Sequence, residues 1–266
     1  MKAATRPPAP QAPWMEQTRY RDPVDLKKLH FLMEAISTIG PAPLDLLEVG
    51  CGSGNIARPL AFLGHLVLAT DIDAASLDFM RLQELPPTLE LQQAGLSVLP
   101  EGRRFDAIIA SEVLEHVEDP ASALAAFRGA LTPRGLVLVT IPNGLGPWEI
   151  GQALSPRRAA GWLARKTGLY RPIKKTLGVR REEKDAETSK FNFESPHLQH
   201  FTLNRFESMC RRAGYDIRVR RHSDGPLTFF PGGRRISWLA RADCRLVDHL
   251  PHWLASGWYF VLVPRP

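Results

Sequence analysis

The chain has 266 residues, 44% of them hydrophobic, and a formal net charge of +6. That is enough to bury the core of one α/β domain and leave room for appendages. No run of 18 apolar residues occurs, so a membrane-spanning helix is not expected. The first 14 residues lack the apolar stretch of a secretory signal, which favours a cytoplasmic protein. Three cysteines without C-x-x-C spacing argue against a disulfide framework and against a zinc ribbon.

Residues 1–22 are rich in proline and alanine, and we expect them to form a flexible arm ahead of a single domain that spans 23–266. Helical and strand-like segments then alternate. Helices are predicted at 24–39, 55–63, 74–84 and 120–131, and strands at 44–49, 65–70, 89–93, 105–110 and 136–141. This alternation is typical of a parallel sheet with helices on both faces, in which a ligand binds at the carboxyl ends of the strands.

The alternation stops after Pro142-Asn143-Gly144, where about 55 residues show no clear strand pattern. We expect this stretch, 144–198, to form a basic lid or insertion. Beyond it the sequence predicts a helix at 203–213, a strand at 215–221, a helix at 236–250 and a last strand at 258–263. Seven strands are therefore expected.

The first predicted strand runs into a glycine turn with the sequence LDLLEVGCGSGNIA at 44–57. Gly50, Gly52 and Gly54 suit tight turning at positive φ and a ligand that lies against the main chain. A dinucleotide fingerprint would need glycine or alanine where Asn55 stands. The carboxylate of Glu48, just ahead of the turn, suits a cationic amino group better than a phosphate.

The second strand ends on Asp71, an acid that could accept hydrogen bonds from both hydroxyls of a ribose. Two residues later, Asp73 stands where the next helix begins, and we assign it the role of N-cap. The alternative for the glycines is that they only turn the chain. Three glycines within five residues after a buried strand are poorly explained by turning alone.

Together with the later segment 105–143, these features resemble the class I S-adenosylmethionine-dependent methyltransferases, whose first motif has the form hhE/DhGxGxG. The resemblance is close over 44–143 and looser over 199–266. It implies a Rossmann-like α/β fold, with a seven-stranded doubly wound sheet that is mostly parallel and has an antiparallel terminal strand. It also implies S-adenosylmethionine as the cofactor. Its ligands would be Glu48 at the amino-acid end, and Gly50, Gly52, Gly54 and Asp71.

A second group of polar residues follows the fourth strand as Glu112, Glu115 and His116. If this turn is helical, the three side chains share one face and could hold Mg²⁺ or Mn²⁺. The E-x-x-E-H form is similar to that of the ubiquinone-pathway O-methyltransferases and the small-RNA 2′-O-methyltransferases, families in which it is associated with a divalent metal. The alternative is a solvated turn in which His116 bonds the main chain.

A hydroxyl acceptor must lose a proton during methylation, which requires a base or a metal. His116 and His200 are the candidate catalytic bases, and His200 could also be a further metal ligand. The alternative for His200, which follows the insertion, is a loop histidine that caps or packs beneath Phe201.

The basic residues are concentrated in the insertion. Residues 155–184 contain ten basic and two acidic side chains, a net charge of +8, so the rest of the chain has a charge of −2. A nucleic-acid surface across the whole fold is therefore disfavoured. Basic residues interleaved with aromatic ones suit a peripheral contact with an anionic membrane. The alternative is a lid that covers the active site.

The sequence thus predicts a methyltransferase that acts on a hydroxyl of a small-molecule or lipid-linked acceptor. One alternative is a regulatory protein that binds the cofactor without catalysis. The other is an RNA 2′-O-methyltransferase. No feature of the sequence indicates an oligomeric state.

Overall fold

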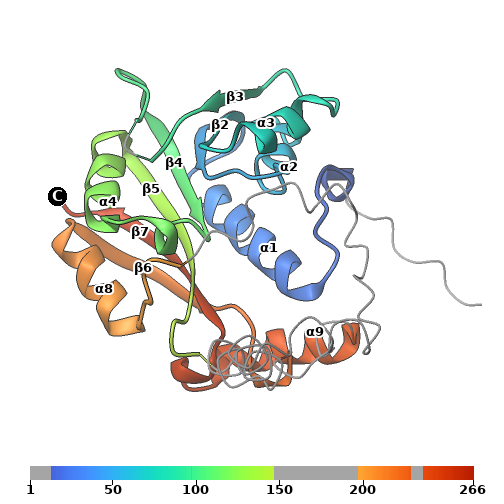
Figure 1. Ribbon diagram of the computed structural model, residues 1–266, viewed down its shortest axis with the longest axis vertical. Coiled ribbons are helices and arrows are strands. Elements are labelled where there is room, and N and C mark those ends of the chain that lie inside the picture. The colour runs from blue at the N-terminus through green and yellow to red at the C-terminus, as the bar shows by residue number, and fades with distance from the viewer. Residues whose placement is uncertain (1–12, 97, 147–196, 229–235) are drawn as a thin grey trace, which may run out of the picture.

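The computed structural model describes residues 13–96, 98–146, 197–228 and 236–266, so the expected insertion at 144–198 lies almost wholly outside the described residues. One seven-stranded sheet forms the centre of the molecule (Figure 1). Its strands are β1 (Asp45–Val49), β2 (Leu66–Asp71), β3 (Leu89–Gln93), β4 (Phe105–Ser111), β5 (Leu131–Pro142), β6 (Tyr215–His222) and β7 (Gly257–Pro264).

The strands lie in the order β3-β2-β1-β4-β5-β7-β6. The first five pair in parallel, and β7 is antiparallel to both β5 and β6. The predicted α/β fold, mostly parallel with antiparallel strands at one end, is therefore confirmed. Because the order reverses beside β1, the carboxyl ends of β1 and β4 open a crevice.

Six α-helices are described: α1 (Pro23–Ser37), α2 (Ala57–Phe62), α3 (Ala74–Arg81), α4 (Pro120–Gly129), α8 (Leu203–Arg212) and α9 (Ser237–Leu246). Several of these helices begin at an N-cap residue whose side chain accepts hydrogen bonds from the first backbone N–H groups of the helix. Asp22 accepts hydrogen bonds from two backbone N–H groups of α1, and Asp73 does the same for α3, which confirms Asp73 as an N-cap. None of the helices among the described residues is both long and apolar enough to span a membrane.

Two apolar clusters cover the two faces of the sheet. On one face α4 and α8 pack through Phe127 and Phe206, and on the other α1 and α2 pack through Leu32 and Leu60 (Figure 1). Burial of these side chains on both faces supplies the main favourable term in folding. It also fixes the strand ends that build the site.

Several boundaries differ from expectation, and the largest difference among the strands is that β5 begins at Leu131 instead of at residue 136. The helix expected to reach residue 131 ends at Gly129, because Leu131 already pairs with Phe105 as the first residue of β5. The flexible arm expected over 1–22 is packed from Pro13 onward, where a 3-10 turn, Pro13–Gln17, brings the ring of Trp14 to 5.5 Å from that of His30.

Candidate functional site

A cavity of about 530 Å³ opens at the carboxyl ends of β1, β2 and β4. The glycine turn and Asp71 line one part of it, and Glu115, His116 and His197 line another. All of the predicted site residues except Gly54 and His200 line it, so two separate stretches of sequence are brought to one cavity.

The three glycines of the turn have different reasons to be glycine. All have positive φ, but a Cβ on Gly50 would lie 2.6 Å from the Val113 side chain, and one on Gly54 would lie 2.5 Å from that of Met80. A Cβ on Gly52 would meet nothing within 4 Å. Gly50 and Gly54 thus allow close packing behind the turn, whereas Gly52 leaves open space in the cavity, where a ligand can approach the main chain.

Asp71 is held by the turn it faces. Its Oδ2 accepts from the N–H of Gly52 at 2.8 Å, and its Oδ1 accepts from the N–H of Asp73 at 2.9 Å. A carboxylate has about four acceptor positions, so each oxygen keeps capacity for a ligand hydroxyl. This geometry fits the predicted contact with a ribose.

Glu48 lies beneath the same turn and is only 2% exposed. Its Oε2 has no hydrogen-bond partner among the described residues. Burial raises the pKa of Glu48 to about 8, because a charged carboxylate is poorly solvated there. A ligand ammonium group would supply the missing partner.

The turn after β4 is not the α-helix on which the predicted metal group depended. Glu112 has a φ of +56°, and only Leu114–His116 form a short 3-10 turn. The Glu112 carboxylate instead accepts from the Thr140 hydroxyl at 2.8 Å. The expected shared helical face of Glu112, Glu115 and His116 is therefore absent, although all three line the cavity.

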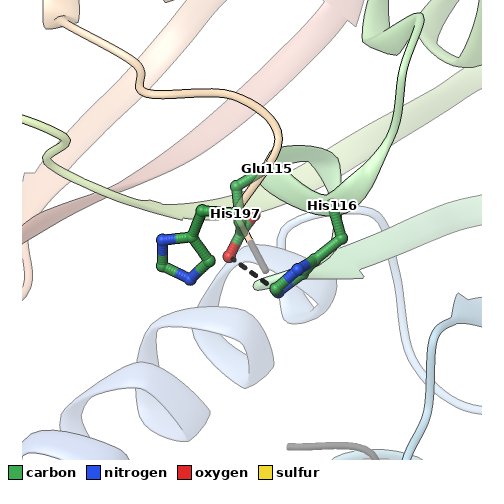
Figure 2. A group of neighbouring side chains, drawn as sticks. All are labelled: Glu115, His116 and His197. Atoms are coloured by element: carbon green, nitrogen blue, oxygen red, sulfur yellow. Dashed lines mark ion pairs between the residues drawn. The ribbon is translucent and has the colours of Figure 1, made fainter. Parts of the chain in front are cut away.

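Glu115 and His116 are instead joined by His197. One ligand atom from each of the three lies within 4.8 Å of the others, and the His116 and His197 ring centroids are 5.0 Å apart. Figure 2 shows Glu115 and His116 on the turn after β4 and His197 on the segment ahead of α8, with the carboxylate between the two rings.

Glu115 is the most unusual member of this group. Its side chain is buried, and neither carboxylate oxygen has a hydrogen-bond partner among the described residues. Burial, and then the neighbouring charge of Glu112, raises the pKa of Glu115 well above its ordinary value. His116 Nε2 is 4.0 Å from Glu115 Oε1. A buried carboxylate beside two imidazoles can receive a proton or hold a cation.

His197 is positioned in the cavity by backbone hydrogen bonds of the two residues that follow it. The N–H groups of Leu198 and Gln199 both donate to the carbonyl of Glu115, at 2.8 and 2.9 Å. His200, by contrast, lines neither this cavity nor the smaller one beside it. The arrangement favours His197 over the predicted His200, and only this tertiary pairing distinguishes the two.

Residues of the amino-terminal part were missed by sequence reasoning. Tyr20 and Lys28 line the cavity, with Lys28 Nζ 5.4 Å from the centre of the Tyr20 ring. Burial raises the pKa of Tyr20 to about 12. Asp25 and Lys28, three residues apart on an otherwise largely apolar helix, were the available signal.

A second cavity, of about 270 Å³, adjoins the first and shares Asp25, Lys28, Glu112 and His197 with it. Its other walls come from the carboxyl end of β5, from the residues after β6 and from the start of β7. Two cavities that share a wall are suited to a reaction between two ligands.

A family model described as a methyltransferase domain matches residues 18–218. A ubiquinone biosynthesis O-methyltransferase from Brucella ovis is 29% identical over 157 residues, which cover 56% of this chain and 61% of that protein. A protein of the same description from Dinoroseobacter shibae is 34% identical over 103 residues, covering 38% and 42%. Both matches span less than two thirds of the relative's length.

Among solved structures, the CcbJ methyltransferase from Streptomyces caelestis is similar, with a TM-score of 0.58 and 17% identity. The match covers 92% of this chain and 91% of that one. At this identity the likeness concerns the fold, and it extends over nearly the whole chain.

Proposed function

We propose that this chain, which belongs to the methyltransferase domain family, transfers a methyl group from S-adenosylmethionine to a hydroxyl on a small-molecule or lipid-linked acceptor. The observation that supports this proposal most is the group of Glu115, His116 and His197 in the cofactor cavity. An amine can lose its proton before it reacts, whereas a hydroxyl needs a base or a metal beside it.

The cofactor would bind across the glycine turn. The open space at Gly52 admits it to the main chain, Asp71 accepts from its ribose hydroxyls, and Glu48 supports its amino group. The cavity that these residues line shares a wall with the second cavity, so an acceptor bound in the second cavity could meet the methyl group there. Placing donor and acceptor in line is worth up to roughly 7 to 11 kcal/mol of the barrier.

The residues present fit a divalent cation. Glu115 offers two buried oxygens without partners among the described residues, and His116 and His197 offer one nitrogen each. Carboxylate and imidazole are suitable ligands for Mn²⁺, and carboxylate for Mg²⁺. When bound, such an ion lowers the pKa of a hydroxyl beside it. The metal group of our proposal is thus Glu115, His116 and His197, with Glu112 as a further carboxylate in the wall.

The reaction itself is a displacement in which the acceptor oxygen forms a bond to the methyl carbon as the bond from carbon to sulfur breaks. Without a bound metal, the acceptor proton would pass to His116 or His197, the two imidazoles in the cavity; with the metal bound, both imidazoles would be its ligands and the proton would pass to water. Glu115 would stabilise the imidazolium that results, since its carboxylate is 4.0 Å from His116 Nε2.

The acceptor and a contact with the membrane are also part of our proposal. The names of the relatives support a hydroxyl acceptor, and a lipid-linked one would suit peripheral contact of the basic insertion with an anionic membrane. The proposed compartment is the cytoplasm, because Cys51, Cys210 and Cys244 are buried and none of the three is in a disulfide.

The proposal is tested by transfer of a labelled methyl group from S-adenosylmethionine to fractions of a cell extract. Transfer should fall in EDTA, return with Mg²⁺ or Mn²⁺, and be lost in Glu115→Gln. The control Glu118→Gln changes an exposed carboxylate three residues away and should retain activity. Full activity in EDTA would refute the metal and leave a histidine base. Cofactor binding without any transfer would favour the regulatory alternative.

A further inference from the structure

We propose that the outer side of α9 and the chain that follows it dock on an anionic membrane. The residues that make this contact, which we call the α9 surface, are Trp238, Arg241, Arg245, Leu246 and Trp253. The inference rests on the proposed membrane contact, and it assigns that contact to described residues outside the basic insertion.

Exposed apolar side chains gather in this part of the chain. Of twelve large hydrophobic residues that are exposed among the described residues, four lie between 236 and 254: Ile236, Trp238, Leu246 and Trp253. Trp238 is 67% exposed and Trp253 is 61% exposed. Tryptophan is highly buried on average, so two exposed indole rings in one short segment need a reason. Apolar groups gathered at a surface mark a site of interaction with a protein or a membrane.

α9 has one side against the protein and one side in solvent. Ala240 is buried on it, and Val247, directly after its last residue, is buried as well. Trp238, Arg241 and Arg245 are all exposed. Their spacing of three and four residues places them on one side of a helix. The solvent side of α9 therefore presents an indole ring together with two guanidinium groups.

The α9 surface has a net positive charge. Arg241 and Arg245 form no ion pair with another residue that the structure describes. The segment 236–254 contains two acids. Asp243 is buried and accepts hydrogen bonds from backbone N–H groups, and Asp248 forms an ion pair with Lys27 at 2.9 Å. The two arginines are thus the charges left to attract an anionic surface.

Tryptophan and arginine together fit a lipid surface. The indole ring is apolar but its N–H is polar, so tryptophan favours the boundary between lipid and water. Arginine beside it adds attraction to anionic headgroups, and surfaces that lie on membranes combine the two residue types. The occupant that we assign to the α9 surface is therefore an anionic lipid bilayer.

The α9 surface lies at the edge of the sheet where the cavities open. β7 is antiparallel to both β5 and β6, so β6 runs parallel to β5 and ends at the same edge. The chain leaves the carboxyl end of β6, forms α9 and returns at the start of β7, which places α9 at this edge (Figure 1). Ser223, after β6, and Gly257, the first residue of β7, both line the second cavity. A membrane bound here would hold a lipid-linked acceptor close to that cavity.

Flotation with vesicles of phosphatidylcholine, with and without phosphatidylglycerol, tests the inference. We expect the native protein to bind the anionic vesicles at least about tenfold more tightly than the neutral ones. Binding to the anionic vesicles should weaken by about tenfold or more when Trp238→Ala and Trp253→Ala are combined. Arg241→Gln combined with Arg245→Gln should weaken it by a similar factor.

Matched controls change the same kinds of residue at the opposite edge of the sheet. Phe62→Ala removes an exposed aromatic ring at the end of α2. Arg211→Gln combined with Arg212→Gln removes two exposed charges at the end of α8. Both helices end where the next strand begins, away from the cavities. These variants should bind the anionic vesicles as the native protein does.

Binding of S-adenosylhomocysteine checks that each variant is folded, and if the tryptophan variant is not, the arginine variant decides the test. Unchanged binding to anionic vesicles in the α9 variants would overturn the inference and leave any membrane contact to another part of the chain. Equal binding to both kinds of vesicle, or none, would also overturn it. So would a dimer of the native protein that binds no vesicles and is lost in the tryptophan variant, because the surface would then hold a second copy of the chain. No methyl transfer enters these measurements, so they succeed or fail independently of the proposed O-methylation.

Discussion

Glu48 is expected to release a proton when the cofactor binds. In the free protein its pKa is about 8, because burial disfavours the charged form, so at pH 6 it is almost entirely protonated. A cofactor ammonium placed beside it favours the carboxylate. Binding at pH 6 should then release about one proton, and affinity should rise about tenfold between pH 6 and pH 7, or roughly 1.4 kcal/mol.

Calorimetry of S-adenosylhomocysteine binding at pH 6, in two buffers that differ in ionisation enthalpy, measures the protons released. The work stays below about pH 7.5, since an α-amino group itself titrates near 7.7 to 8.0. Glu48→Gln should abolish the release and flatten the pH dependence, whereas Glu90→Gln, an exposed change on β3, should alter neither. Absence of release from the native protein, or equal release from Glu48→Gln, would refute this account of Glu48.

The free energy of unfolding of the free protein should fall as pH rises from about 4.5 towards 8, because the Glu48 carboxyl, with its raised pKa, binds its proton more tightly in the folded state than in the unfolded state. Thermal unfolding should show that this decrease is shallower in Glu48→Gln, by up to about 1.4 kcal/mol per pH unit. Asp71→Ala should weaken cofactor binding by roughly 1.5 to 3 kcal/mol in calorimetry. Asp71→Asn, which keeps one acceptor oxygen for the Gly52 N–H, should weaken binding less. Equal cofactor affinity of the native protein and both variants would contradict the contact of Asp71 with the ribose. Gly50→Ala should destabilise the protein by more than about 1 kcal/mol in urea unfolding. Adding Val113→Ala should recover only part of the loss, because it relieves the 2.6 Å clash between the new Cβ and the Val113 side chain but leaves residue 50 at positive φ. Full recovery would show that the positive φ costs nothing at this position.

The parts of the fold and site that could be predicted from sequence are those in which neighbouring residues determine the structure. The glycine turn follows its strand directly, and Asp73 caps the helix that it precedes, so short-range patterns were sufficient. Alternating strands and helices likewise predicted the parallel sheet, and the resemblance to the methyltransferases implied an antiparallel terminal strand, which is β7.

The parts that could not be predicted depend on contacts between distant segments. His197 reaches the cavity because two N–H groups that follow it donate to the Glu115 carbonyl, more than 80 residues earlier, and no local pattern separates it from His200. Glu112 does not lie on the expected helical face, because it is hydrogen-bonded to Thr140 on the neighbouring strand: its N–H donates to the Thr140 carbonyl, and its carboxylate accepts from the Thr140 hydroxyl.

The central claim is that the methyl group of S-adenosylmethionine passes to a hydroxyl oxygen. The most direct measurement uses cofactor labelled with carbon-13 at that methyl and follows the label by NMR in the products formed with extract fractions. The account predicts a signal at the chemical shift of a methyl bonded to oxygen, which is absent with Glu115→Gln and present with Glu118→Gln. A labelled methyl on nitrogen or carbon, formed by the native protein, would contradict it.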